Sequence, residues 1–154
     1  MRKLPEVEEA RSVMAQGMEW GVWKWLMEKK RVRQIADRAT DALNAAEMKV
    51  KQTWSEELKQ AYDALVDQEF SKSKRKGKNG DFNGIDPEAL DVARQVKAAD
   101  DEAETCRLDA EDTFDEAERR MSTELARQGA KKALETYDLH EKAIRKAESA
   151  ARPK

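Results

Sequence analysis

The feature that most constrains this chain is a basic, glycine-rich stretch from Ser71 to Pro87. It contains three of the six glycines and one of the three prolines of the 154-residue sequence, together with five lysines or arginines. Residues 34–70 before it and 88–128 after it contain neither glycine nor proline. Because these two residue types are the strongest helix breakers, the pattern predicts two long helical arms joined by one connection.

Each arm has apolar residues that recur every three or four positions. They run from Ile35 to Leu65 in the first arm, and from Val92 to Ala147 in the second. This is the period of an amphipathic helix. Many of these residues are alanine, which lets two helices approach closely but buries little apolar area.

We therefore predict an all-α single domain, a long antiparallel helical hairpin resembling a coiled coil. Its arms cover about 5–70 and 88–151, beginning at Pro5 and at Asp86-Pro87, because proline is favoured in the first turn of a helix. The hairpin would pair residues 34–70 with 88–124 in a rod of about 100 Å. The alternative is an elongated four-helix bundle, with breaks near Lys30 and Gly129.

The charge of the chain is high but nearly balanced. Charged residues make up 40% of the sequence, and the net charge is −2. Such a balance is typical of exposed helices that carry both signs of charge, whereas disordered chains usually have a high net charge. The signs are unevenly distributed, since residues 86–125 hold 14 acidic and 5 basic residues and residues 126–154 hold 4 acidic and 8 basic ones.

The termini and the cysteine content bear on the compartment. Cys106 is the only cysteine, which excludes an intramolecular disulfide and favours a reducing compartment. The first residues have no apolar run of the kind found in a secretory signal, and no window is long and apolar enough for a transmembrane helix. We expect a cytoplasmic protein.

A tryptophan-rich stretch is the strongest candidate for a partner interface. It is the densest apolar part of the chain, and basic residues 29–33 follow it. Tryptophan and arginine are enriched at protein interfaces, and tryptophan with lysine is favoured at membrane surfaces. A local core is the remaining interpretation. The candidate interface consists of Met18, Trp20, Trp23, Trp25 and Leu26.

The basic connection is the candidate for phosphate binding. Clustered lysines attract nucleic-acid or lipid phosphates through charge alone, without sequence selectivity. A solvated connection between the arms explains the same residues. The candidate phosphate-binding residues are Lys72, Lys74, Arg75, Lys76 and Lys78.

Other polar residues give no pattern of a catalytic or metal site. His140 is the only histidine and lies among charged residues, so we expect a surface side chain rather than a ligand. The acidic runs of the second arm are expected to form a solvated face. We therefore expect no enzymatic activity, no cofactor and no bound metal.

These observations favour a structural or adaptor protein that acts through helix packing. Its expected partner is a second copy of the chain or another helical protein. A first alternative is charge-driven nucleic-acid binding through the loop 72–78 and the basic C-terminal third. A second alternative is attachment to a membrane surface through residues 18–33.

Overall fold

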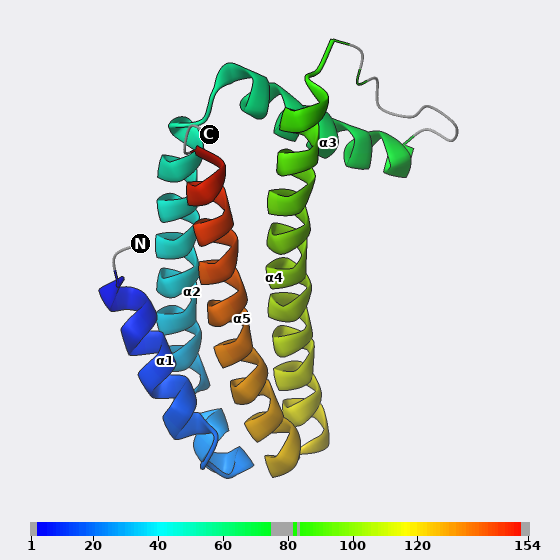
Figure 1. Cartoon of the computed structure of the whole chain (residues 1–154). Helices are drawn as coiled ribbons and strands as arrows, with labels where there is room; N and C mark the ends of the chain where they lie inside the picture. Colours follow the sequence, from blue (N-terminus) through cyan, green and yellow to red (C-terminus); the bar gives the residue numbers. More distant parts are fainter. Residues whose placement is uncertain (1–2, 75–81, 83, 152–154) are drawn as a thin grey trace.

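The computed structural model describes residues 3–74, 82 and 84–151, with side chains omitted for 71–74. These residues form five helices and no strand, which confirms the all-α class (Figure 1). The helices are α1 (Pro5–Gly17), α2 (Val22–Gln52), α3 (Glu56–Lys74), α4 (Pro87–Arg120) and α5 (Thr123–Ala151).

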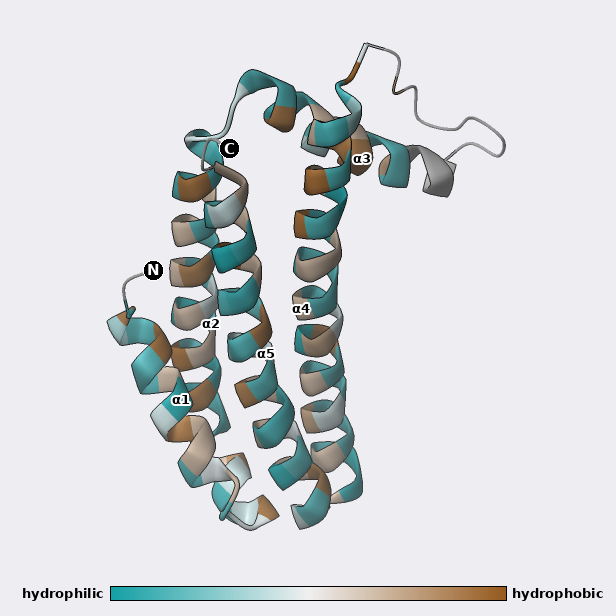
Figure 2. Ribbon diagram, in the orientation of Figure 1, coloured by the Kyte–Doolittle hydropathy of each residue, from teal (hydrophilic) through white to brown (hydrophobic). Residues whose placement is uncertain are grey.

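Helix α5 lies at the centre of the bundle. It packs most extensively against α4 and also contacts α2 and α1, while α1 packs on α2. Helix α3 crosses the end of the bundle at which α4 begins (Figure 1). Apolar residues gather on the helix faces that meet in the interior (Figure 2).

The arrangement is closer to the elongated bundle than to a two-armed rod. The tightest antiparallel hairpin is made by α4 and α5, both within the predicted second arm. Of the predicted pairing between residues 34–70 and 88–124, the contact between α3 and α4 is substantial, whereas α2 and α4 hardly touch.

The first helix break lies at residues 18–21 rather than near Lys30, which is inside α2. The chain turns there because α5 supplies polar partners for its backbone. The Val22 N–H donates to Thr123 Oγ1 at 3.0 Å. The Arg127 guanidinium donates to the carbonyl oxygens of Glu19 and Trp20, at 3.1 and 3.0 Å.

A second break, at residues 53–55, divides the predicted first arm. Trp54 is buried there, and its indole Nε1 donates to the Ala147 carbonyl oxygen at 2.9 Å. Ser55 Oγ accepts from the Leu58 N–H at 3.3 Å and so satisfies a free donor of the first turn of α3.

The break in the predicted second arm lies at Met121 and Ser122, not at Gly129. Met121 adopts the left-handed conformation, with φ 52° and ψ 47°, and Ser122 Oγ accepts from the Leu125 N–H at 3.2 Å. The predicted helix starts at Pro5 and at Asp86-Pro87 are confirmed, and Asp86 Oδ2 accepts from the Ala89 N–H.

Two apolar clusters fill the interior. The larger one joins α1, α2, α4 and α5, and includes Val7, Trp25, Leu43, Tyr137 and Ile144. The smaller one lies where α3 crosses the bundle, and includes Trp54, Leu58, Leu65 and Val96.

Candidate functional site

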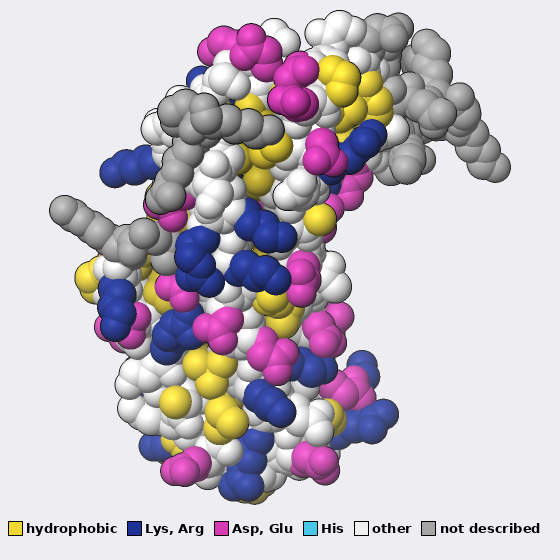
Figure 3. Space-filling view, in the orientation of Figure 1, with side chains coloured by type: hydrophobic (Ala, Val, Ile, Leu, Met, Phe, Trp, Pro, Cys, Tyr) yellow, Lys and Arg dark blue, Asp and Glu magenta, His cyan; other side chains and the backbone are white. Residues whose placement is uncertain are grey.

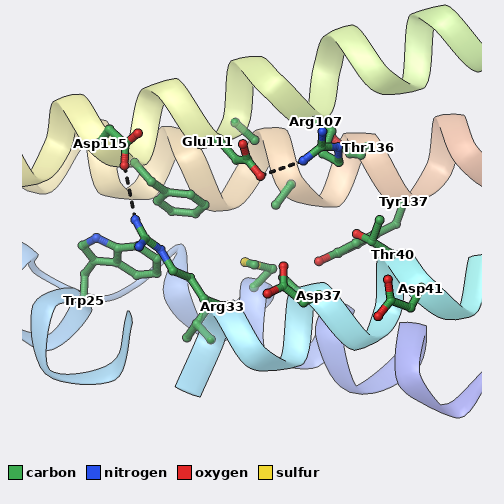
Figure 4. A pocket seen from close by; sticks show the side chains of 16 residues that line it. Trp25, Arg33, Asp37, Thr40, Asp41, Arg107, Glu111, Asp115, Thr136 and Tyr137 are labelled. Atoms are coloured by element: carbon green, nitrogen blue, oxygen red, sulfur yellow. Dashed lines mark hydrogen bonds and ion pairs between the residues drawn. The ribbon is translucent and has the colours of Figure 1, made fainter. Parts of the chain in front are cut away.

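The candidate site is a groove between α2 and α4. Because these two helices hardly touch while both approach α5, a cavity of about 650 Å³ remains between them. Figure 4 shows α4 above the cavity and α2 below it, with α5 and α1 behind. Ligand sites of proteins commonly have volumes of about 300–1,000 Å³, so the groove is large enough for a ligand or for side chains of a partner.

One end of the groove is aromatic. The rings of Trp25 and Phe114 are stacked, with centroids 4.2 Å apart and an interplanar angle of 14°. Trp25 is only 4% exposed, and its indole Nε1 has no hydrogen-bond partner among the described residues. The stack gives this end a rigid apolar wall, because aromatic pairs in such geometry stabilise each other by about 0.5–1.5 kcal/mol.

The rim of the groove carries both signs of charge. An ion pair between Arg33 and Asp115 crosses from α2 to α4 at 3.2 Å, and Arg107 pairs with Glu111 along α4 at 2.7 Å (Figure 4). Asp37 and Asp41, on α2, form no ion pair within the described part of the chain. The lining therefore has four carboxylates against two guanidinium groups.

Tyr137 supplies a polar group from the floor of the groove. Its side chain is 3% exposed, and its hydroxyl points into the cavity in Figure 4. Burial raises the pKa of this hydroxyl to about 12, so it is neutral at physiological pH and is available as a hydrogen-bond donor.

The groove continues into a second, more polar cavity of about 480 Å³. The two cavities share Thr40, Arg107, Thr136 and Tyr137. The second is lined by a cluster of titratable side chains from four helices. These are Glu47 and Lys51 of α2, Tyr62 of α3, Asp100 of α4 and His140 of α5.

The cluster is bonded internally. Lys51 Nζ lies 3.1 Å from Glu47 Oε2 and 3.0 Å from Asp100 Oδ2, and the Tyr62 hydroxyl donates to the same Asp100 oxygen at 2.5 Å. His140 Nε2 lies 3.5 Å from Glu47 Oε1. His140 is therefore mostly buried, and the expectation of a surface histidine is wrong, because α2 brings Glu47 against this side of α5.

The two carboxyl groups of the cluster have opposite pKa shifts. Burial, and then the hydrogen bond with Glu47, raise the pKa of Asp100 to about 6. Burial also opposes the ionisation of Glu47, but hydrogen bonds from His140 and Asp100 outweigh it and lower the pKa of Glu47. Asp100 Oδ1 is buried and has no hydrogen-bond partner among the described residues, whereas Oδ2 accepts from Lys51 and Tyr62.

The predicted interface residues are divided between the interior and the surface. Trp25 belongs to the core, and Trp20 and Leu26 are half-buried against it. Met18 is exposed, and Trp23 is 72% exposed. The five therefore do not form one surface, and the part that stays a candidate interface is Met18 with Trp23. Sequence reasoning missed Met27, which is 82% exposed and lies one helical turn from Trp23.

The predicted phosphate-binding residues Lys72, Lys74, Arg75, Lys76 and Lys78 lie outside the residues whose side chains the structure describes. A different basic surface lies between α4 and α5, where Lys142, Arg145 and Lys146 line a cavity of about 440 Å³ with Val92 and Val96. Lysine and arginine side chains gather over the upper half of α5 in Figure 3.

The described residues contain neither a metal cluster nor a membrane-spanning helix. Among them, no group of three or more histidine, cysteine, aspartate and glutamate side chains is placed to hold a metal ion. None of the helices, within the described ranges, has an apolar segment long enough to cross a bilayer. No protein-family model, curated protein or solved structure matches the chain.

Proposed function

We propose that this protein is a non-enzymatic adaptor that binds a helix of another protein in the groove between α2 and α4. The observation that carries the proposal is the incomplete packing of these helices, which leaves a groove with an aromatic wall on the side of the bundle where a further helix would fit. Helix-in-groove recognition uses apolar anchors that recur every three or four residues along the bound helix.

The lining of the groove indicates the chemistry of the bound helix. Phe114 and Ala36, which line the groove and are half-buried, would contact its apolar anchors. Asp37 would pair with one of its cations, since it has no ion-pair partner within the described residues. The excess of carboxylates favours a basic amphipathic helix over an acidic one, because opposite charges across an interface favour the correct partner and increase the association rate.

The polar cluster beside the groove supports binding rather than chemistry. Its charged groups are bonded to one another, and together they link α2, α3, α4 and α5. We interpret the cluster as a clamp that holds the walls of the groove at a fixed separation.

A pair of synthetic helical peptides tests the proposal. One carries leucine anchors with lysines, and the other carries the same anchors with glutamates. We expect the basic peptide to bind at least tenfold more tightly in fluorescence anisotropy, and Ala36→Phe, which fills the groove from α2, to weaken that binding. Ala98→Phe, at an exposed position of α4 outside the groove, is the matched control. Equal binding of both peptides, or no effect of Ala36→Phe, would contradict the proposal.

A second candidate function is charge-driven binding of nucleic acid, for which the specific observation is on α5. Lys142, Arg145 and Lys146 form no ion pair in the part of the chain that the structure describes, whereas Lys132 on the same helix pairs with Asp109. Affinity for a labelled single strand would fall by at least tenfold between about 50 and 200 mM salt. It would also fall after Lys142→Glu with Lys146→Glu, or after neutralisation of the lysines and arginine of the loop 72–78.

A further inference from the structure

The outer face of α2 carries a stripe of exposed side chains. Its members alternate in steps of four and three residues, which is the heptad spacing that keeps side chains on one face of a helix. All eight are exposed. The stripe consists of Trp23, Met27, Lys30, Gln34, Asp37, Asp41, Asn44 and Met48.

The apolar members of the stripe are among the most exposed large side chains of the protein. Trp23 is 72% exposed, Met27 82% and Met48 63%. They lie toward the two ends of the stripe, and the charged members lie between them. Large exposed apolar side chains on one face, bordered by polar ones, are typical of an interface between proteins.

The stripe is complementary to itself when it is read in the opposite direction. Positions 23 and 48 are equally distant from a point between Ile35 and Ala36, and so are positions 30 and 41. Two antiparallel copies of α2 would thus place Trp23 opposite Met48 of the second copy, and Lys30 opposite Asp41 of the second copy. Every such contact occurs twice, as a two-fold symmetric interface requires.

We propose that the chain forms a symmetric dimer through antiparallel packing of the outer faces of α2. The contact would extend over about 38 Å of helix, at 1.5 Å per residue from Trp23 to Met48. At each end of the contact, Trp23 and Met27 of one copy would be buried with Met48 of the other copy. Two Lys30–Asp41 ion pairs would form between these ends.

Charge selects this orientation and this occupant. Parallel packing would place Lys30 against Lys30 and Asp41 against Asp41, and like charges across an interface are unfavourable. A lipid surface would bury Lys30, Asp37 and Asp41 among apolar chains. This is unfavourable, because no ion pair within the described residues neutralises these three charges. A second copy supplies the opposite charges for Lys30 and Asp41.

The dimer does not depend on the groove proposed above. Groove residues such as Trp25, Val32 and Ala36 lie on a different side of α2, and the stripe shares with the groove only Asp37 and Asp41, at its rim. The two proposals can therefore fail separately. The chain could form the dimer without binding a peptide in the groove, or bind the peptide without forming the dimer.

Charge reversal of the central pair tests the proposal. Light scattering coupled to size exclusion should give a mass near twice 17.6 kDa that falls toward 17.6 kDa on dilution. Lys30→Glu alone and Asp41→Lys alone each create two like-charged contacts, and each should raise the dimer Kd at least tenfold. The variant that carries both reversals restores opposite charges and should return to within threefold of the wild type.

An equimolar mixture of the two single variants gives an independent readout. Each single variant brings like charges together when it pairs with itself, whereas the mixed pair has opposite charges at both contacts. Mixing should therefore restore the dimer. Circular dichroism would verify that all variants are folded. A wild-type monomer at every concentration, or a double variant as weak as the single ones, would overturn the proposal.

Cross-linking tests the orientation. In a Cys106→Ser background, a mixture of Lys30→Cys and Asp41→Cys chains should form a disulfide-linked dimer, and neither variant alone should do so. Efficient cross-linking of Lys30→Cys chains with one another would indicate parallel packing and overturn the proposal. Flotation of a monomeric chain with anionic vesicles would assign the stripe to lipid and would overturn it as well.

Discussion

The ring of Phe114, on α4, lies directly against the backbone of Gly129, on α5. A methyl group added at Gly129 would lie 2.6 Å from ring atoms Cδ1 and Cε1 of Phe114. The other face of the Phe114 ring is covered by Trp25, which stacks on it at 4.2 Å. Phe114 therefore lies between the Gly129 backbone and the Trp25 ring, and the glycine lets the ring take its place in the aromatic wall of the groove.

We expect Gly129→Ala to lower the free energy of unfolding, although alanine is the better helix former. The propensity gain is about 1 kcal/mol, whereas overpacking typically costs about 1–3 kcal/mol, so the clash with the Phe114 ring should outweigh the gain. Urea unfolding would measure the difference. Phe114→Leu in the same chain should recover part of the loss, since it removes the clashing ring atoms.

Gly17→Ala is the matched control for this substitution. Gly17 is also buried in a helix, but a methyl group there would meet only ordinary contacts, at 3.6 Å from Ala130 Cβ. We expect its effect to be neutral or slightly stabilising. A comparable loss in both variants would show that the Phe114 contact is not the cause.

Gly129 also shows why some of the helix breaks were not predictable from local sequence alone. Glycine in a helical pattern is a signal for a break, but here the packing of Phe114 requires it inside α5. Conversely, the turn at residues 18–21 depends on Thr123 and Arg127, which are about a hundred residues away in sequence. The all-α class and the helix starts at Pro5 and Pro87 followed from local rules and are confirmed.

Some breaks did leave a signal in the sequence. Ser55 is followed by two glutamates, and Ser122 by Thr123 and Glu124, which is the pattern of a helix start. For the tryptophan stretch, the sequence could not decide which side chains are buried. That depends on the rotation of α2 about its axis, which turns Trp25 toward Phe114 and Trp23 toward solvent.

Trp54 should contribute to stability through a hydrogen bond as well as through burial. Trp54→Phe keeps an aromatic ring but removes the bond from Nε1 to the Ala147 carbonyl oxygen, which fastens the turn before α3 to α5. We expect a loss of about 1–3 kcal/mol, because part of the buried ring is lost together with the bond. Trp23→Phe, at an exposed position, should change stability by less than about 0.5 kcal/mol. Thermal or urea unfolding of both variants would test this difference.

Met121→Gly should stabilise the protein. Met121 is the residue that ends α4, and it has a positive φ of 52°. This conformation costs a residue other than glycine about 1–2 kcal/mol. Its side chain is exposed, so little packing is lost. Met121→Ala removes the same side chain but keeps the backbone cost. We therefore expect the glycine variant to unfold at higher urea concentration than the alanine variant, and equal midpoints would contradict the explanation.

Asp100 should make stability depend on pH in a specific direction. Because the pKa of Asp100 rises from 3.8 to about 6 on folding, the folded chain keeps a proton that the unfolded chain releases between these values. The contribution of Asp100 to stability is therefore present at low pH and is lost as the pH rises through about 6.

Asp100→Asn tests this assignment. The asparagine amide can accept from Lys51 and Tyr62 and donate to Glu47, as the protonated carboxyl group does, but it does not titrate. We expect the variant and the wild type to be similarly stable near pH 4.5, and the variant to become more stable by about 1–2 kcal/mol near pH 7.5, since one pKa unit corresponds to about 1.4 kcal/mol. Asp101→Asn, on the adjacent exposed carboxylate that pairs with Lys97, should show no such gain. Urea unfolding at both pH values would decide, and a constant difference between wild type and Asp100→Asn would show that Asp100 does not hold the proton.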